Sequence, residues 1–262
     1  MQIAELADLN LHVFDEGPSN GPTVVFANSL GTDFRLWDEM LPHLPKGLRL
    51  IRYDKRGHGL STCPRGPYAM GALVRDAEQL LDHLNVRDAV FVGCSIGGLI
   101  AQGLAVKRMD QVRAMVLSNT AAKIGTADMW GERIKAIQKD GLEAIADATM
   151  ERWFSRRFRN TPALHAWRNM LTRQPVEGYT GCAAAIAGTD FYTTTSGLTL
   201  PTLAIAGSED GATPPDLVRE TAELIKGSRF ELMRGVGHLP MVEDPASFAR
   251  ILTTFLKDIG HV

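Results

Sequence analysis

Five short runs of apolar, largely β-branched residues constrain the fold of this chain more than any other feature. They do not alternate between apolar and polar residues, which is typical of strands covered on both faces of a parallel sheet. Segments with helical periodicity, such as residues 73–84, lie between them. This alternation predicts an α/β fold with a mostly parallel, doubly wound sheet. An alternating run at residues 9–14 suggests an antiparallel hairpin at an edge of the sheet. The five apolar runs are residues 23–27, 50–53, 89–93, 114–118 and 202–207.

One stretch interrupts this alternation. Residues 122–190 show helical patterns without an intervening strand, and they contain 10 basic and 8 acidic residues. We expect this segment to form a helical lid inserted between two strands of an α/β core formed by residues 1–121 and 191–262. Such a lid would cover the carboxyl edge of the sheet, where ligands bind in these folds. Its small positive excess favours an anionic substrate, although a solvated helix face gives the same count.

Composition excludes several classes of protein. With 28 basic and 30 acidic residues among 262, the chain has no basic field that would attract nucleic acid. No apolar run approaches the ~20 residues needed to cross a bilayer, and the acidic start does not resemble a signal peptide. Three cysteines without a CxxC pair fit a reducing cytoplasm. We expect a cytoplasmic protein without cofactor or metal, acting on a small molecule.

Residues 93–98, Gly-Cys-Ser-Ile-Gly-Gly, follow a predicted strand and open a predicted helix. This is the context of the G-x-S-x-G nucleophile elbow, in which Ser95 occupies a strained turn. Its neighbours must be small because other backbone segments pass close by. A glycine-rich turn with an incidental serine would carry the same letters, but the strand before and the helix after favour a catalytic serine.

A serine nucleophile needs a base, and the base needs an orienting acid. On this fold the chain order is Ser, Asp or Glu, then His. Asp210 follows the strand-like run 202–207, and His238 lies in a glycine-rich loop near the C-terminus. Glu209 is the alternative acid, but the shorter Asp210 side chain better suits a strand-end turn. His58 precedes the elbow, and we expect it to have a structural hydrogen-bonding role.

The tetrahedral intermediate of acyl transfer requires two amide donors directed at its oxyanion. The first is expected to be the backbone N–H of Ile96, directly after the nucleophile. The second should come from the loop after the first buried strand, residues 28–32, and we expect it to be the Leu30 amide.

With these motifs the sequence resembles the α/β-hydrolase superfamily over nearly the whole chain and, more narrowly, the 3-oxoadipate enol-lactonases of bacterial aromatic-acid catabolism. Some of the matching stretches are common among small-ester hydrolases, whereas others lie at or within the predicted lid and carry the narrower resemblance. The common stretches are residues 28–32, 52–61 and 93–98, and the discriminating ones are residues 119–125, 151–154 and 178–184.

The resemblance implies hydrolysis of a five-membered enol-lactone bearing a carboxylate to a 3-oxo dicarboxylic acid, with Ser95, His238 and Asp210 as the triad. The free carboxylate needs a cation in the site. Trp130 and Arg133 are three residues apart on a predicted helix and share a face, so they could supply an apolar wall and that charge. The alternatives are a general carboxylesterase, a perhydrolase and a non-catalytic lactone receptor.

Overall fold

The computed structural model describes residues 2–262, and its centre is an eight-stranded sheet. The strand order is β1-β2-β4-β3-β5-β6-β7-β8, and within this sheet only β2 runs antiparallel to its neighbours. The predicted α/β fold with a mostly parallel sheet is therefore confirmed, and the antiparallel hairpin expected near residues 9–14 is formed by β1 and β2, with β1 at the sheet edge. The strands are β1 (Gln2–Glu5), β2 (Asn10–Glu16), β3 (Thr23–Ala27), β4 (Arg49–Tyr53), β5 (Ala89–Cys94), β6 (Val112–Ser118), β7 (Thr202–Gly207) and β8 (Arg229–Met233).

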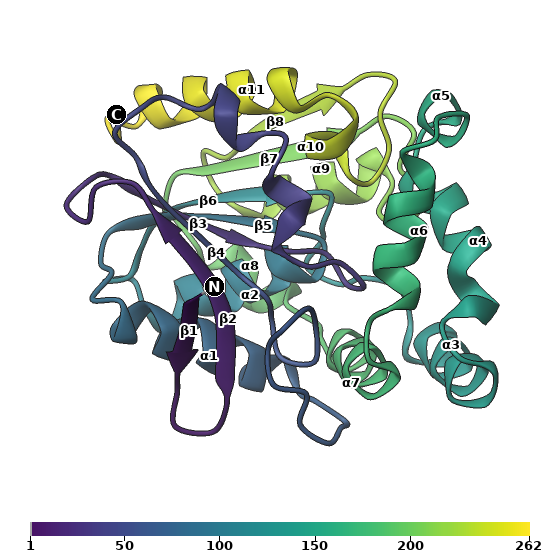
Figure 1. The fold of residues 1–262 in the computed structure, drawn as a ribbon. Coiled ribbons are helices and arrows are strands. Elements are labelled where there is room, and N and C mark those ends of the chain that lie inside the picture. The colour runs from purple at the N-terminus through teal and green to yellow at the C-terminus, as the bar shows by residue number, and fades with distance from the viewer. Residues whose placement is uncertain (1) are drawn as a thin grey trace.

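Helices cover both faces of this sheet (Figure 1). Helices α1, α2 and α8 lie on one face, and α11 lies on the other. Residues of β3 and β5 are entirely buried between them, which explains why their sequences are continuously apolar. These helices and the connecting segments are η1 (Phe34–Trp37), η2 (Leu41–His43), α1 (Met70–His83), α2 (Ile96–Lys107), α8 (Tyr192–Ser196), α9 (Pro215–Leu224), α10 (Pro240–Glu243) and α11 (Pro245–Asp258).

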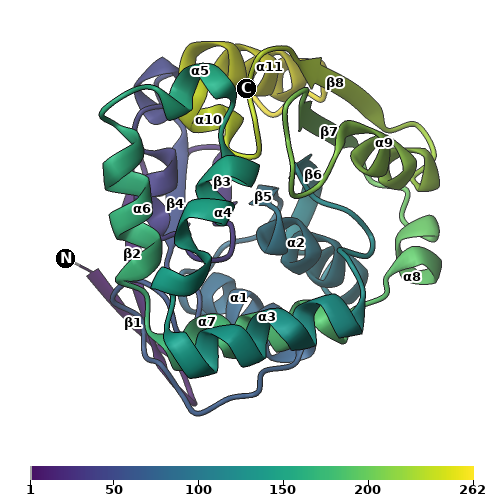
Figure 2. The same ribbon diagram turned by 90° about the vertical axis from the view of Figure 1, so that its right-hand side faces the viewer.

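Between β6 and β7 the chain forms a helical insert, which we define as helices α3 to α7. These helices gather at one end of the sheet, and Figure 2 shows α7 and α3 along the bottom of the view with α6, α4 and α5 above them on the left. No strand lies between β6 and β7 in residues 2–262, so the helical character predicted for this segment is correct. The insert consists of α3 (Ala127–Asp140), α4 (Glu143–Trp153), α5 (Arg156–Arg159), α6 (Leu164–Thr172) and α7 (Val176–Ala187).

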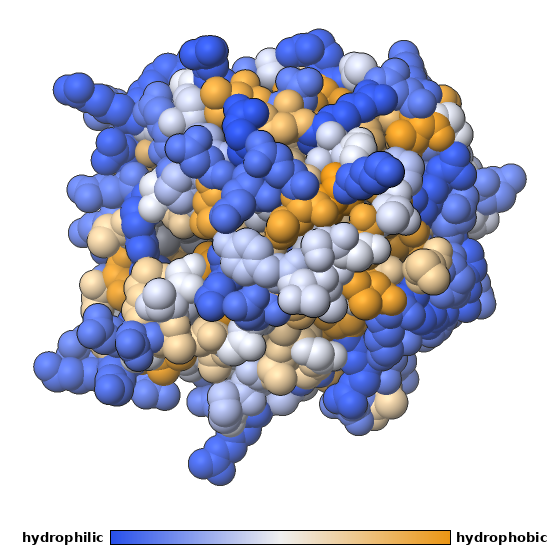
Figure 3. Space-filling view, turned by 180° about the vertical axis from the view of Figure 1, so that it is seen from behind, coloured by the Kyte–Doolittle hydropathy of each residue, from blue (hydrophilic) through white to orange (hydrophobic). Residues whose placement is uncertain are grey.

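Among residues 2–262 the exposed large apolar side chains do not gather in one region. These residues come from several separate elements, and on the back face apolar patches alternate with hydrophilic ones (Figure 3). Within residues 2–262 no helix has the length and hydropathy of a membrane span. The exposed large apolar residues are Ile3, Leu60, Val106, Met109, Met129, Val176 and Val262.

Candidate active site

The candidate residues follow successive parallel strands, whose carboxyl ends meet at one edge of the sheet. Ser95 comes directly after β5, and Asp210 follows β7 by three residues. His238 lies in the loop after β8, and Leu30 lies in the loop after β3. Because β3, β5, β7 and β8 are parallel, side chains far apart in sequence are brought to the same edge.

Ser95 has the backbone strain that the elbow motif predicts. Its φ is 56° and its ψ is −118°, a conformation that residues with a Cβ rarely adopt. Glycines allow the sharp turn, since a Cβ at Gly97 would lie 2.1 Å from the carbonyl oxygen of Ala27. The Ser95 amide donates to Ser118 O (3.0 Å), and its own carbonyl accepts from the Thr120 hydroxyl (2.6 Å). The position of Ser95 is thus fixed by its backbone.

Asp210 and His238 form a buried pair, with Asp210 Oδ2 2.9 Å from His238 Nδ1. The same oxygen accepts from Asn119 Nδ2 and from the Thr213 hydroxyl, both at 2.8 Å. The second carboxylate oxygen of Asp210, Oδ1, accepts from the amides of Ala212 (2.7 Å) and Thr213 (3.0 Å). Burial on its own would raise the pKa of Asp210, but the charge and hydrogen bond of His238, with the bonds from Asn119 and Thr213, lower it below the usual value. Asp210 is therefore a carboxylate that fixes the imidazole with Nδ1 as the donor.

The other imidazole nitrogen of His238, Nε2, has a hydrogen-bonding neighbour other than Ser95. His238 Nε2 lies 3.3 Å from the hydroxyl of Ser29, and within residues 2–262 it makes no hydrogen bond to Ser95 Oγ. The structure therefore joins Asp210 to His238, and it places Ser95 at the same sheet edge without completing the third contact. Ser29, which the sequence identified only as part of a loop, is a direct neighbour of the His238 imidazole.

The two predicted oxyanion donors have no protein acceptor. Neither the Leu30 nor the Ile96 amide donates to another group within residues 2–262. Ile96 is the first residue of α2, so the positive end of the helix dipole also points toward this position. The next amide of the loop, Gly31 N, donates to His58 Nε2 (3.0 Å). Burial lowers the pKa of His58 well below its usual range, so a neutral imidazole holds the loop, which fits the structural role expected for this residue.

Comparison with known proteins agrees with this geometry. Residues 22–245 match the family model for the alpha/beta hydrolase fold. The chain belongs to this family. It is also similar to two 3-oxoadipate enol-lactonases of Acinetobacter baylyi, with 33% and 34% identity over 95% of this chain and 94% of each relative. A crystal structure of the enol-lactonase from Burkholderia xenovorans superposes with a TM-score of 0.94 at 34% identity, covering 98% of this chain and all of that one. The family is hydrolytic, and this α/β hydrolase is an enzyme.

In this α/β hydrolase the glutamate next to Asp210 has a different task. Glu209 is exposed, and its Oε2 accepts from the backbone amide of Arg156 (3.1 Å) at the start of α5. Asp210, rather than Glu209, contacts the imidazole. The position after β6 carries no carboxylate, but Asn119 there supplies the amide that donates to Asp210. The triad motif does not identify Asn119, because the motif specifies only an acid, and the position after β6 has none.

The two residues predicted to bind substrate both lie on α3 of the insert, in different surroundings. The Trp130 side chain is buried, and its indole N–H donates to Ile124 O (2.7 Å), so Trp130 offers a ring face but no free donor. Arg133 is half-buried and donates to the hydroxyls of Tyr179 (2.8 Å) and Thr149 (2.8 Å). No carboxylate in residues 2–262 forms an ion pair with Arg133.

A second arginine, Arg152 at the end of α4, stands beside this one. Burial and the nearby charge of Arg133 lower the pKa of Arg152, so two guanidinium groups repel each other in the insert. Within residues 2–262 the Arg152 side chain has neither a hydrogen bond nor an ion pair. Its backbone carbonyl accepts from Gly211 N (3.0 Å), and the next carbonyl, of Trp153, accepts from the His238 amide (2.7 Å). The end of α4 that carries Arg152 is therefore attached to the loops that carry Asp210 and His238.

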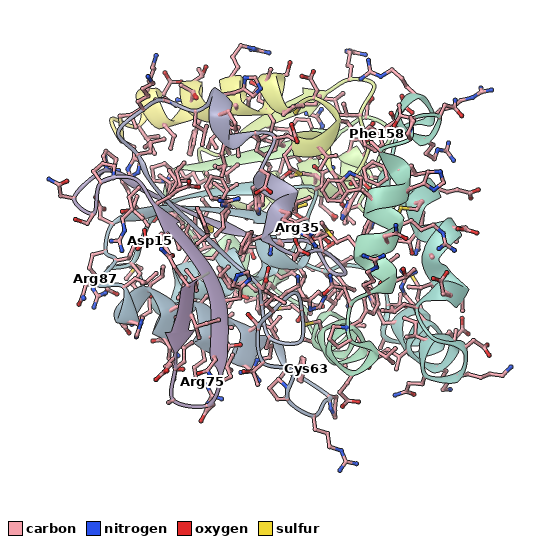
Figure 4. All side chains as sticks on the ribbon, in the orientation of Figure 1. Asp15, Arg35, Cys63, Arg75, Arg87 and Phe158 are labelled. Carbon is pink, nitrogen blue, oxygen red and sulfur yellow. The ribbon has the colours of Figure 1, made fainter. Side chains whose placement is uncertain are left out.

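A separate hollow of about 1000 Å³ lies between the insert and the core. Arg35 of η1 and Phe158 of α5 lie on its two sides (Figure 4), and its walls contain His12 and acidic as well as basic residues. None of the triad residues lines it, and its lining contains no serine, cysteine or threonine. Within residues 2–262 no cluster of three or more histidine, cysteine or acidic side chains could hold a metal ion.

Proposed function

We propose that this enzyme hydrolyses a small enol-lactone that carries a free carboxylate, converting 3-oxoadipate enol-lactone to 3-oxoadipate in bacterial aromatic-acid catabolism, the β-ketoadipate pathway. Ser95 is the nucleophile, His238 the general base and Asp210 the acid that orients it. The amides of Leu30 and Ile96 bind the oxyanion. The relatives named as 3-oxoadipate enol-lactonases support this choice of substrate.

One observation carries the proposal: two half-buried arginines of the insert, Arg133 and Arg152, have no carboxylate partner within residues 2–262, and the backbone at Arg152 is hydrogen-bonded to the loop of Asp210. A cation that is partly removed from water is stabilised by a nearby anion. Arg133 and Arg152 lack that anion within the described chain, so the carboxylate arm of the substrate would supply it. An uncharged ester would leave both cations uncompensated. The insert therefore favours an anionic lactone over simple esters.

In the first half of the reaction, Ser95 Oγ attacks the lactone carbonyl while His238 Nε2 takes its proton. Nε2 must exchange its contact with the Ser29 hydroxyl for one with Ser95 Oγ, which suits a free enzyme whose catalytic contacts tighten on binding. The carbonyl oxygen becomes an oxyanion between the two free amides. Collapse breaks the ring C–O bond, and the leaving enol oxygen takes the proton from His238.

In the second half, His238 activates a water molecule that attacks the acyl-enzyme. A second tetrahedral intermediate forms in the same donor pair, and Ser95 leaves with the proton that the imidazole received. The released enol tautomerises to a ketone, so the product is a 3-oxo dicarboxylic acid. The net change is addition of one water to the lactone.

The first test follows the loss of enol-lactone absorbance in the ultraviolet. We expect turnover by the wild-type enzyme and a loss of at least about 1000-fold in Ser95→Ala. Ser29→Ala is the matched control, because it removes a second hydroxyl beside the same imidazole nitrogen and should retain most activity. Equal loss in both variants would refute Ser95 as the sole nucleophile. Near-full activity in Ser95→Ala would refute the mechanism.

The second test addresses the carboxylate. Arg152→Met and Arg133→Met should lower kcat/KM for the lactone about 10- to 100-fold, since a charged hydrogen bond contributes about 1.5–3 kcal/mol. The same variants should leave p-nitrophenyl acetate hydrolysis within about threefold. Arg168→Met is the control, because Arg168 is a cation of the insert already paired with Glu143 and Asp147.

Other outcomes would favour the alternatives. Fast aryl-ester cleavage without lactone turnover would indicate a carboxylesterase. Peracid formation from a carboxylic acid and peroxide would indicate a perhydrolase. Tight lactone binding with negligible turnover would indicate a receptor.

A further inference from the structure

A buried lysine touches the loop that carries the Leu30 amide. Lys55, in the turn after β4, is 3% exposed, and its Nζ donates to the carbonyl oxygens of Ser29 (2.7 Å) and Thr32 (3.3 Å). Within residues 2–262 no carboxylate lies within ion-pair distance of this ammonium. Neither the triad nor the predicted carboxylate site uses Lys55. Burying a cation whose near partners are two backbone carbonyls costs folding free energy, so its presence requires an explanation.

The covalent connectivity of the loop provides an explanation for this buried cation. The Ser29 carbonyl and the Leu30 N–H belong to the same peptide unit, and they point in opposite directions across it. A cation at the oxygen is about 5 Å from the amide nitrogen, given ordinary peptide dimensions. It withdraws electron density toward the oxygen, increases the C–N double-bond character and makes the N–H a stronger donor. We propose that Lys55 strengthens the oxyanion hole by polarising the Ser29–Leu30 peptide unit.

This inference rests on the proposed function, because it requires Leu30 N–H to face the oxyanion. Lys55 does not touch the substrate, so it is a positioning and polarising residue. The loop is held from two sides, since Lys55 binds two of its carbonyls and His58 accepts from the Gly31 amide. A fixed donor loses no reorganisation energy when charge develops on the oxyanion. The geometry therefore favours the transition state more than the bound substrate.

The ionisation of Lys55 makes the proposal testable by pH. Burial lowers the pKa of Lys55 to about 8, against the opposing influence of nearby Cys182 and Asp54. As the pH rises through this value the ammonium loses its charge, so polarisation is present below pH 8 and lost above it. The titratable groups that face Nζ are Asp33 ahead of η1, Asp54 and His58 after β4, Cys94 at the end of β5 and Cys182 of α7.

The experiment measures hydrolysis of p-nitrophenyl acetate, a neutral ester that does not engage the arginine pair, from pH 6.5 to 9.5. In the wild type we expect kcat to fall about tenfold through pH 8 with KM nearly constant. Lys55→Met should be about tenfold slower at pH 7 and should lack this decline. Lys55→Arg, with a permanent charge, should retain activity at pH 7 and also lack the decline. Lys123→Met, which removes an exposed lysine of the Asp190 ion pair, is the control.

A purely structural role would give a different pattern. It would change KM and the unfolding temperature in Lys55→Met while leaving the alkaline decline intact, and that result would overturn the proposal. If neither variant folds, NMR of the wild-type enzyme tests the proposal. The 13C shift of the Ser29 carbonyl and the 15N shift of the Leu30 amide should titrate together near pH 8, and flat shifts would overturn the proposal. Loss of activity in Ser95→Ala with no effect in Lys55→Met would reject this inference alone, whereas an active Ser95→Ala would reject the proposed function.

Discussion

Replacing Asp210 by asparagine should leave the fold intact and change the tautomer of the base. The position of Oδ1 receives two backbone N–H groups, from Ala212 and Thr213, so the amide oxygen of the new side chain must occupy it. The NH2 group then occupies the position of Oδ2, 2.9 Å from His238 Nδ1. Two N–H groups cannot face each other, so Nδ1 must become the acceptor. The proton moves to Nε2, where it blocks abstraction of the serine proton.

The size of the expected loss in kcat follows from this change of tautomer. In a triad with the same geometry the equivalent change lowers kcat by about 10⁴, which corresponds to about 5.5 kcal/mol of transition-state stabilisation. We expect the same loss in Asp210→Asn, with KM changed only slightly because the substrate does not touch Asp210. The new NH2 also faces Asn119 Nδ2, which is itself a donor. This clash should cost a further 1–3 kcal/mol of folding free energy.

The assay compares initial rates on the enol-lactone and on p-nitrophenyl acetate at pH 7, with urea unfolding measured in parallel. Asp216→Asn, an exposed aspartate in the first turn of α9, is the matched control and should be neutral. Glu209→Gln should retain near-wild-type activity, since Glu209 binds only the Arg156 amide. More than about 10% residual activity in Asp210→Asn, or a comparable loss in Glu209→Gln, would refute the assignment of the acid.

The Asp210→Asn variant should also differ from the wild type in how its unfolding temperature changes at acid pH. Because the folded pKa of Asp210 lies below its unfolded value, the carboxylate stabilises the fold above the unfolded pKa of about 3.9, and this contribution is lost as the pH falls through the folded value. Asp210→Asn has no such contribution to lose. Its unfolding temperature should therefore decrease less than that of the wild type between pH 6 and pH 3. Parallel decreases would contradict the lowered pKa.

Three further single variants and one double variant test packing and a buried ion pair. Gly97→Ala should destabilise the fold by about 3 kcal/mol or more, because the new Cβ would lie 2.1 Å from Ala27 O, whereas Gly131→Ala in α3 meets nothing within 4 Å and should stabilise by about 0.5–1 kcal/mol. Urea midpoints check both, and an unchanged midpoint in Gly97→Ala would contradict the close approach at the elbow. Arg56→Met should cost about 3–5 kcal/mol, since it strands the buried carboxylate of Asp76 that Arg56 binds through two 2.6 Å hydrogen bonds. Arg56→Met/Asp76→Leu should recover much of this loss, and a double variant no more stable than the single would count against it.

The central strands were predictable because burial on both faces leaves an unambiguous pattern. The apolar runs 23–27 and 202–207 coincide with β3 and β7. Strand β8, Arg229–Met233, has no such signal: it lies at the sheet edge and alternates exposed with partly buried residues, including charged ones. The division of the chain into core and lid at residues 122 and 190 stays a prediction.

Candidate residues were predictable where a chemical role imposes an order along the chain. Ser95, Asp210 and His238 follow such an order, with a strand and a turn before the first two. Arg152 and Lys55 follow none, because their relevance depends on which partners they lack in three dimensions. A missing carboxylate beside a buried cation is a property of packing, and no local sequence pattern reports it.

The insert and the catalytic loops are joined by backbone hydrogen bonds rather than by side-chain packing alone. At the end of α4 the carbonyls of Arg152 and Trp153 accept from Gly211 N and His238 N, so one short segment holds both the loop of the acid and the loop of the base. Ser155, two residues after Trp153, strengthens the link, since its amide donates to Glu243, which also accepts from Gly237 N (2.7 Å). A displacement of this end of α4 would move the Arg152 guanidinium and the His238 imidazole together. Under the proposed function, recognition of the substrate carboxylate would therefore be coupled geometrically to the position of His238.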